Sequence, residues 1–297
     1  EGDFAKLEDK FNSIPQLLSE LIRSAFIPKK GARFIIADFS AIEARILAYI
    51  AGEKWRIDVF KSHGKIYEAS ASKLFKVPIE MITKESNLRV KGKVAELALG
   101  YGGGVGALKA MGALEMGIEE DELQDLVNKW RLSNSNIGRL WWAIHKAAIN
   151  ALKTREVNIV GYIKIYYQGD IMFITLPSGR KLSYVKPRIE KNKYGGDSIT
   201  YEGVSVAKKW ERIETYGPKL VENIVQAIAR DILGEAMIRL RDKAYDIVMH
   251  VHDEIIIEAK EGQGSLEEVI KIMTETPIWA RGLPLDAEGF ESKYYKK

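Results

Sequence analysis

The chain has 297 residues, of which 46% are hydrophobic and 29% charged, an ordinary globular balance that allows one large domain or two lobes. It has no cysteine, which excludes disulfides and Cys-ligated zinc, and no run approaches the ~20 apolar residues of a membrane helix. The formal charge of +4 permits a nucleic-acid partner without requiring one. The N-terminus has no signal peptide, and it lacks an initiator Met, so we expect a fragment of a longer chain. The absence of cysteine allows a reducing, cytoplasmic setting.

The first half is predicted to be mainly helical after one short buried strand. Residues 33–38 form an apolar strand ending in Asp38, and residues 42–52 have the apolar spacing of a helix that Gly52 closes. Further helices are expected over 64–75, over 86–101, and over 119–153 as two helices that separate near residues 133–136.

The second half is predicted to combine β structure with one long helix. Residues 159–206 are β-rich, and LPSGRKL at 176–182 is typical of a hairpin turn. A long helix is expected over 218–243, with Pro218 in its first turn. Residues 247–258 then form two short strands around a tight turn, followed by a terminal tail. This order predicts an α+β fold with an antiparallel sheet.

Two aspartates follow apolar strands at positions where a carboxylate is half-exposed. Asp38 lies where a strand ends and a helix begins, and Asp253 lies at the turn of the predicted hairpin. If the two strands are neighbours, the carboxylates could converge on hard cations such as Mg²⁺, as two-metal phosphoryl transfer requires. Taken singly, Asp38 has the alternative of a helix N-cap and Asp253 that of an ordinary turn residue.

The helix predicted over 86–101 has an unusual face. Residues spaced by four positions lie along it: Arg89, Lys93, Leu97 and Tyr101. The two cations suit a triphosphate, and the aromatic ring suits stacking on a base. A solvated charged face is the alternative. The glycines at 102–104 are not a phosphate loop, because they follow the helix and lack the G-K-[ST] ending.

These segments, in this order, resemble the sequence motifs of family A DNA polymerases, most closely the phage-type members. The matches are D-F-S-A-I-E-A-R-I-L-A from Asp38, R-V-K-G-K-V-A-E-L-A-L-G-Y-G from Arg89, V-H-D-E from Val251, and Q-A-I-A-R-D from Gln226. The resemblance runs from about Ile22 to the C-terminal tail. It implies a polymerase palm, an antiparallel sheet with flanking helices, together with a mostly helical fingers subdomain.

The resemblance also implies a division of the chain. The expected parts are an N-terminal segment leading into the palm (1–32), palm with the first motif (33–52), fingers (53–155), and palm with the long helix and the H-D-E hairpin (156–297). No exonuclease acidic motif is found, and the chain has no room for a full thumb. We therefore expect palm and fingers only, with a thumb or exonuclease region on a longer parent chain.

In this resemblance the catalytic residues are Asp38, Asp253, Glu254 and Lys93. Asp38 and Asp253 would bind two Mg²⁺ ions, or Mn²⁺, assisted by the backbone carbonyl of Phe39, and Glu254 matches an accessory acid. The implied reaction is attack of a primer 3′-OH on the α-phosphorus of a dNTP, with Lys93 protonating the pyrophosphate that leaves.

Other residues match positions that contact the nucleotide or the primer–template DNA. The nucleotide-binding set is Arg89, Lys93, Glu43, Tyr101 and Tyr67, and the DNA-binding set is His252, Gln226 and Tyr101. Glu43 matches the steric gate that disfavours a 2′-OH. Ordinary alternatives exist for three of these residues: Glu43 as a first-turn acid, His252 as a hydrogen-bonded strand histidine, and Gln226 as a buried amide.

The match has departures, and other functions compete with it. Leu97 stands where the family usually has Phe or Tyr, Ala41 replaces a polar residue, and Tyr67 stands where a nucleotide-contacting His is common, with His63 close by. A single-subunit RNA polymerase is the nearest alternative, against which Glu43 argues. A non-catalytic DNA-binding fragment and a two-metal nuclease are the others, and the nuclease would need a denser acidic cluster.

Overall fold

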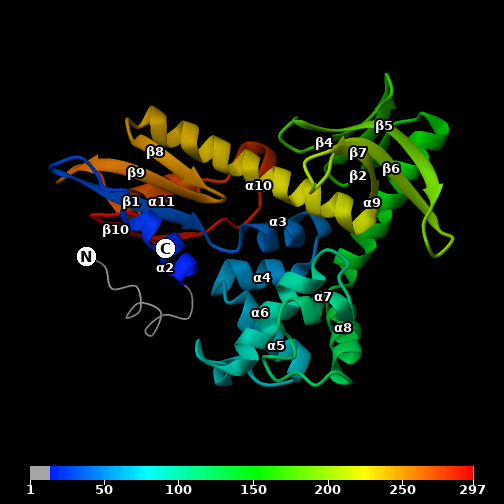
Figure 1. Ribbon diagram of the computed structural model, residues 1–297, viewed down its shortest axis with the longest axis horizontal. Coiled ribbons are helices and arrows are strands. Elements are labelled where there is room, and N and C mark those ends of the chain that lie inside the picture. Colours follow the sequence, from blue (N-terminus) through cyan, green and yellow to red (C-terminus); the bar gives the residue numbers. More distant parts are fainter. Residues whose placement is uncertain (1–13, 297) are drawn as a thin grey trace. The chain divides into compact units, whose positions relative to one another are not determined.

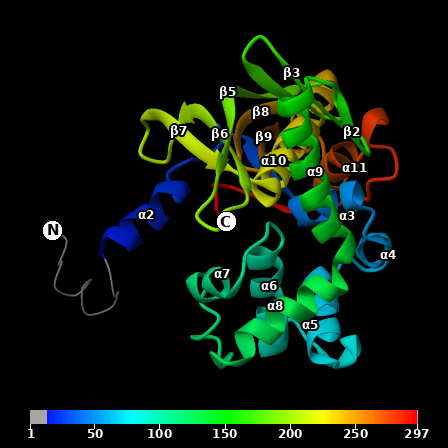
Figure 2. The ribbon, with the colours of Figure 1, turned by 90° about the vertical axis from the view of Figure 1, so that its right-hand side faces the viewer.

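The computed structural model describes residues 14–296, and it combines helices with two antiparallel sheets, which confirms the predicted α+β fold (Figures 1 and 2). Residues 1–13 of the predicted N-terminal segment lie outside the described part. The chain divides into two units. The described part of the first is 14–40, 232–275 and 285–296, and the second is 41–231 with 276–284. Within the described residues, no helix is long and apolar enough to cross a membrane.

The first unit is built on a four-stranded antiparallel sheet. Its order is β10 (Ala287–Ser292), β1 (Ala32–Phe39), β9 (Glu254–Lys260) and β8 (Asp246–Val251). The helices of this unit are α2 (Ile14–Ser24), the last part of α10 (Gly217–Asp242) and α11 (Leu266–Met273). β1 is a central strand with both faces covered, which is why its sequence is almost continuously apolar.

The two faces of β1 have different neighbours. α11 packs against one face, where Gly289 of β10 lies opposite Ala37 and a Cβ on this glycine would be 2.9 Å from the Leu266 side chain. On the other face, Phe34 and Ile36 form a buried cluster with residues of β9 and the C-terminal segment. Asp38 follows Ile36 by two residues and therefore lies on this second face.

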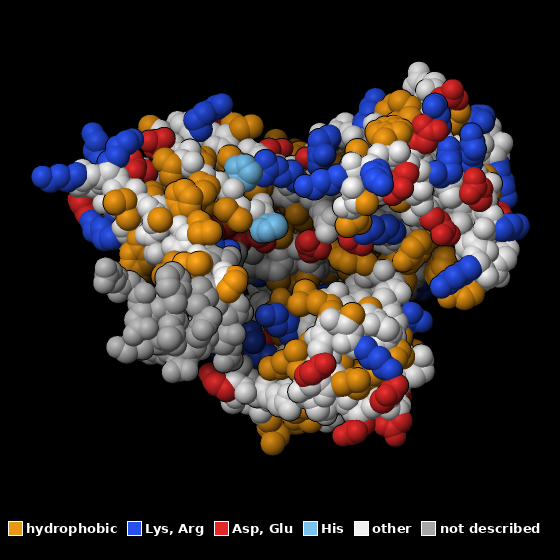
Figure 3. Space-filling model, viewed as in Figure 1, with side chains coloured by type: hydrophobic (Ala, Val, Ile, Leu, Met, Phe, Trp, Pro, Cys, Tyr) orange, Lys and Arg blue, Asp and Glu red, His pale blue; other side chains and the backbone are white. Residues whose placement is uncertain are grey.

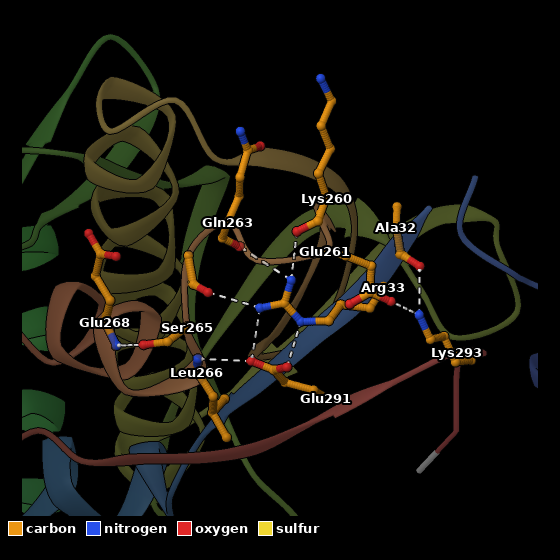
Figure 4. Close-up of polar contacts among 11 residues, drawn as sticks. Ala32, Arg33, Lys260, Glu261, Gln263, Ser265, Leu266, Glu268, Glu291 and Lys293 are labelled. Carbon is orange, nitrogen blue, oxygen red and sulfur yellow. Dashed lines mark hydrogen bonds and ion pairs between the residues drawn. The ribbon is translucent and has the colours of Figure 1, made fainter. Parts of the chain in front are cut away.

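A polar clamp holds the beginning of β1 (Figure 4). The Arg33 guanidinium is paired with the Glu291 carboxylate of β10 at 2.5 Å and donates to the carbonyl oxygens of Lys260 and Gly264 at 2.7 and 2.8 Å. The hydrogen bond and charge of Arg33 lower the pKa of Glu291. This network joins β1, β10 and the loop after β9 at the end of the strand remote from Asp38.

The second unit contains most of the helices. In chain order they are α3 (Ile42–Ala51), α4 (Lys54–Ser62), α5 (Ile66–Phe75), η1 (Ile79–Met81), α6 (Asn87–Leu99), α7 (Val105–Ala110), α8 (Glu122–Ser133), α9 (Ser135–Thr154), the first part of α10, and η2 (Ile278–Ala280). α5 and α6 approach closely at Gly92, where a Cβ would lie 2.3 Å from the Tyr67 carbonyl oxygen.

A six-stranded antiparallel sheet completes the second unit. Its strands follow chain order: β2 (Asn158–Val160), β3 (Ile163–Gln168), β4 (Ile171–Thr175), β5 (Lys181–Lys191), β6 (Asp197–Val204) and β7 (Trp210–Thr215). The apolar stripe of α9 packs against this sheet, contacting β2 to β6 (Figure 2). Many Lys and Arg side chains lie on the surface around the sheet (Figure 3).

Most predicted elements are confirmed, but several differ from the prediction. The prediction of an unstructured terminal tail is wrong, because residues 266–292 contain α11, η2 and β10. β10 is a strand because it pairs with β1. The sequence did not predict α2, α4, η1, α7 or β7. The helix predicted to reach residue 101 ends at Leu99, so Tyr101 lies in the following turn.

Candidate active site

Three carboxylates share one face at one end of the four-stranded sheet. The half-buried Asp38 lies directly opposite Glu254 of β9 and Glu288 of β10. Residues opposite one another on antiparallel strands point to the same side, so the three acids lie on the face away from α11. A hollow of about 310 Å³ opens there, lined by Ile36, Asp38, Glu254, Glu288, Gly289 and Phe290.

Asp253 lies in the turn between β8 and β9, beside the end of β1. Val251 pairs with Glu254, so the exposed His252 and the half-buried Asp253 form a two-residue turn. His252 has a φ of 55°, the positive value that such turns require. The Asp253 carbonyl accepts a hydrogen bond from the backbone N–H of the buried Phe39 at 3.4 Å. Strand pairing therefore brings Asp38 and Asp253 to the same end of this sheet.

The placements of the acids decide between some of the sequence alternatives. Asp38 is a strand residue, and the N-cap position before α3 is occupied by Ala41, so the N-cap alternative for Asp38 is wrong. The turn placement of Asp253 is confirmed. His252 lies in the turn and not in a strand.

Glu254 is held by a residue that the sequence did not point to. Its side chain is buried and accepts a hydrogen bond from the Tyr295 hydroxyl at 2.7 Å. Tyr295 packs with Phe34 and Ile36 and is itself anchored by its backbone N–H, which donates to the Phe26 carbonyl. Burial and the hydrogen bond to Glu254 raise the pKa of Tyr295 to about 12. No local pattern in the C-terminal segment could have predicted this long-range contact.

The basic face of α6 lies in the second unit. Arg89 is half-buried, donates to the Glu68 carboxylate of α5 at 2.7 Å, and lies over the Tyr67 ring at 5.5 Å. Lys93 and Leu97, the next residues on this face, are exposed. Burial raises the pKa of Tyr67, as does the charge of Glu96. The structure thus joins Arg89 and Tyr67 and leaves Lys93 open to solvent.

Tyr101 and Glu43 form a pair within the second unit. The Tyr101 hydroxyl donates to the Glu43 carboxylate at 2.7 Å, and burial together with this carboxylate raises the tyrosine pKa. The turn after α6 is tightly packed, because a Cβ on Gly103 would lie 1.9 Å from the Ala98 carbonyl oxygen. Gln226 of α10 is exposed, so its alternative as a buried amide is wrong.

Comparison with known proteins decides the family of this chain. The model of DNA polymerase family A matches residues 10–160, just over half of the chain. The chain belongs to DNA polymerase family A.

Several relatives support this membership. The chain is 52% identical to the DNA polymerase of Bacillus phage SP02, over the whole chain and 46% of the relative. It is 28% identical to DNA polymerase I of Borreliella burgdorferi, over 90% of the chain and 25% of the relative. This family A chain therefore spans about half or less of the length of these curated relatives.

A solved structure shows the same fold. The POL domain of Pol1 from M. smegmatis, in complex with DNA primer-template and dNTP, superposes with a TM-score of 0.64 over 92% of this chain and 42% of that one. At 23% sequence identity, this likeness concerns the fold alone.

One buried polar network, in the motif that begins at Arg89, was not predicted from the sequence. Glu96 of α6 is buried and paired with Arg56 of α4, and it also accepts from the Ser70 hydroxyl at 2.7 Å and the Trp130 indole N–H at 3.1 Å. The Asn134 side-chain oxygen accepts from Arg56 Nη1 at 3.0 Å, the same nitrogen that donates to Glu96. A usable signal was present, because Glu96 stands among Val94, Ala95, Ala98 and Leu99, all on the buried side of α6.

Proposed function

We propose that this chain is the nucleotidyl-transfer core of a template-directed DNA polymerase, which adds dNTPs to the 3′ end of a primer. One observation carries the proposal. The end of β1 and the β8–β9 turn are joined by the Phe39–Asp253 hydrogen bond, with Asp38 in register with Glu254. Carboxylates from two remote motifs therefore lie at the same sheet end, as two-metal phosphoryl transfer needs.

The donor set at this sheet end fits hard cations. Asp38, Asp253 and the Phe39 carbonyl offer oxygen ligands only, which Mg²⁺ prefers. Among residues 14–296, no group of three or more His, Asp or Glu side chains is arranged as a metal cage. Mg²⁺ is usually bound by one or two carboxylates together with substrate phosphates and water. Two Mg²⁺ ions held by these residues would neutralise charge on the attacking and leaving oxygens.

The second unit would handle the nucleotide. We assign the triphosphate to Arg89 and Lys93, because Lys93 is an exposed cation one turn along α6 from Arg89, and Lys93 would also donate a proton to the pyrophosphate. Glu43, held by Tyr101, would disfavour a 2′-OH on the incoming sugar. Tyr67 would assist Arg89 through their cation–π contact.

The remaining assignments follow the family. Primer–template DNA would contact His252, Gln226 and Tyr101, and Glu254 would act as an accessory acid held by Tyr295. We propose 33–52 and 156–297 as palm and 53–155 as fingers, a palm that draws on both units. The proposed setting is the cytoplasm of a bacterial or phage-infected cell, with a thumb or exonuclease region on a longer chain.

Primer extension with Asp253→Asn tests the proposal. This substitution keeps the shape of the side chain and removes its charge, so we expect extension to fall by at least about 100-fold. Asp246→Asn is the matched control, because Asp246 is an exposed aspartate at the other end of β8. Undiminished extension by Asp253→Asn would refute the assignment.

Two further readouts separate the alternatives. If the unaltered chain binds primer–template DNA but does not extend it, the non-catalytic binding function holds instead. If it prefers rNTPs to dNTPs, the RNA polymerase alternative holds. With Glu43→Ala we expect the preference for dNTPs over rNTPs to decrease, because the carboxylate under the sugar is removed.

A further inference from the structure

The outward face of strands β3, β4 and β5 carries an unusual set of side chains. In the register of the sheet, Lys164, Thr175 and Lys181 lie side by side, and Tyr166, Phe173 and Ser183 form the next row. We call these six residues the aromatic face. The alternate positions, including Ile165, Met172 and Ile174, are buried on the side that packs against α9. The aromatic face is therefore the solvent side of this part of the sheet.

Two aromatic rings lie on this solvent side, with lysines over them. The Tyr166 and Phe173 rings are stacked with centroids 5.4 Å apart, and both are partly exposed. The Lys164 ammonium lies 5.3 Å from the Tyr166 centroid, and that of Lys181 lies 5.6 Å from the Phe173 centroid. Cation–π contacts at exposed sites are weak, so the lysines can leave the rings for an anionic partner at little cost in free energy.

The charge of this region selects the kind of partner. Over residues 158–215 there are ten Lys and Arg and six Asp and Glu, a net charge of +4 that equals the formal charge of the whole chain. The outward positions of β3, β4 and β5 up to Val185 contain no acid. Within residues 14–296, neither Lys164 nor Lys181 forms an ion pair. The face therefore suits a polyanion that also offers flat rings.

We propose that the aromatic face binds single-stranded DNA, with bases stacked on Tyr166 and Phe173 and phosphates contacted by Lys164 and Lys181. Aromatic platforms beside cations are the general means of holding single strands without reading sequence. In a duplex the faces of internal bases are already stacked on their neighbours, which leaves only phosphates for this surface. The inference rests on the proposed function, since it takes DNA as the ligand.

Fluorescence anisotropy of the whole chain with a labelled oligo-dT tests the binding, in EDTA and without dNTPs. A length of roughly 16 nucleotides covers the largest site known for one OB fold, a general single-strand-binding domain. We expect Tyr166→Ala/Phe173→Ala to weaken binding at least about tenfold, because loss of one base–aromatic stack weakens binding by roughly 5- to 150-fold. Affinity for blunt duplex DNA should stay unchanged.

Two aromatic variants are matched controls. Tyr166→Phe keeps the ring and should keep the affinity. Tyr194→Ala removes another tyrosine, whose side chain is 83% exposed. The Lys193 ammonium lies 5.0 Å from the centroid of this ring, as in the aromatic face. Tyr194, however, lies in the β5–β6 turn and outside the aromatic face. The Tyr194→Ala variant should bind oligo-dT like the unaltered chain. Loss of affinity in Tyr194→Ala equal to that in the double variant would overturn the proposal.

A lysine variant gives a second, independent readout. In Lys164→Gln/Lys181→Gln, which alters only flexible side chains, the slope of log affinity against log salt should decrease by about 1.4, since each single-strand phosphate contact contributes roughly 0.7. Unchanged affinity and slope in both double variants, or no oligo-dT binding by the unaltered chain, would overturn the proposal. Primer extension by the unaltered chain is scored separately. If the unaltered chain extends primers but the double variants bind oligo-dT normally, this inference alone is refuted. If the double variants weaken oligo-dT binding as expected but the unaltered chain does not extend primers, the proposed function alone is refuted.

Discussion

The buried ion pair between Arg56 and Glu96 connects α4 to α6. Their side chains are 1% and 3% exposed, so water neither screens nor replaces the pair. Replacing Arg56 by methionine keeps most of the side-chain volume and removes the charge. The Glu96 carboxylate would then remain buried with two neutral donors, the Ser70 hydroxyl and the Trp130 indole.

The size of the effect follows from these contacts. Removing one partner of a buried pair destabilises a protein by about 3–5 kcal/mol, because a buried charge is left without its counter-ion. The two remaining donors still stabilise the carboxylate, so we expect Arg56→Met to lower the free energy of unfolding by about 3 kcal/mol. Replacing both residues, in Arg56→Met/Glu96→Gln, should be less destabilising than Arg56→Met alone, because no buried charge remains.

Urea unfolding followed by tryptophan fluorescence reports on the second unit, which contains this ion pair. All six tryptophans belong to the second unit, and two of them, Trp130 and Trp141, are stacked next to Glu96. Lys54→Met is the matched control on the same helix, because Lys54 forms an exposed pair with Asp58 that should contribute at most about 0.5 kcal/mol. Equal effects of Arg56→Met and Lys54→Met would refute the reasoning.

Three further outcomes are expected. Tyr295→Phe should lower the stability of the first unit by about 1.5 kcal/mol, since one hydrogen bond to a buried carboxylate is lost, whereas the exposed neighbour Tyr294→Phe should have no effect in hydrogen-exchange measurements of β9. Gly103→Ala should destabilise the second unit by about 1–3 kcal/mol in urea, because its Cβ would meet the Ala98 carbonyl, and Gly104→Ala, with open space around it, should not. Burial lowers the pKa of His145, so the unfolded chain binds this proton more tightly. The contribution of neutral His145 to the free energy of unfolding is therefore fully present above the unfolded pKa of about 6.5, and it is lost as the pH falls through the lower folded value. A urea midpoint that falls no faster with acid in the unaltered chain than in His145→Gln would contradict this.

The sequence alone determined the local structure and the family. Strand β1 was predictable because a strand covered on both faces must be apolar throughout, and α3 because its apolar spacing ends at Gly52, whose left-handed conformation glycine readily adopts. The positions of Asp38 at a strand end and Asp253 in a turn followed from the same patterns. The order of the motifs predicted family A, which the family comparison confirmed.

Only the tertiary structure decided which side chains meet. Glu288 lies opposite Asp38 because β10 pairs with β1, and Tyr295 reaches Glu254 because the chain returns to the sheet at its C-terminal end. Tyr101 and Glu43 are 58 residues apart, yet they share a hydrogen bond. Periodicity arises from neighbours a few residues away, whereas these contacts depend on how remote segments pair and pack. For that physical reason the residues proposed to perform the chemistry could be named from the sequence, but the residues that contact and position them could not.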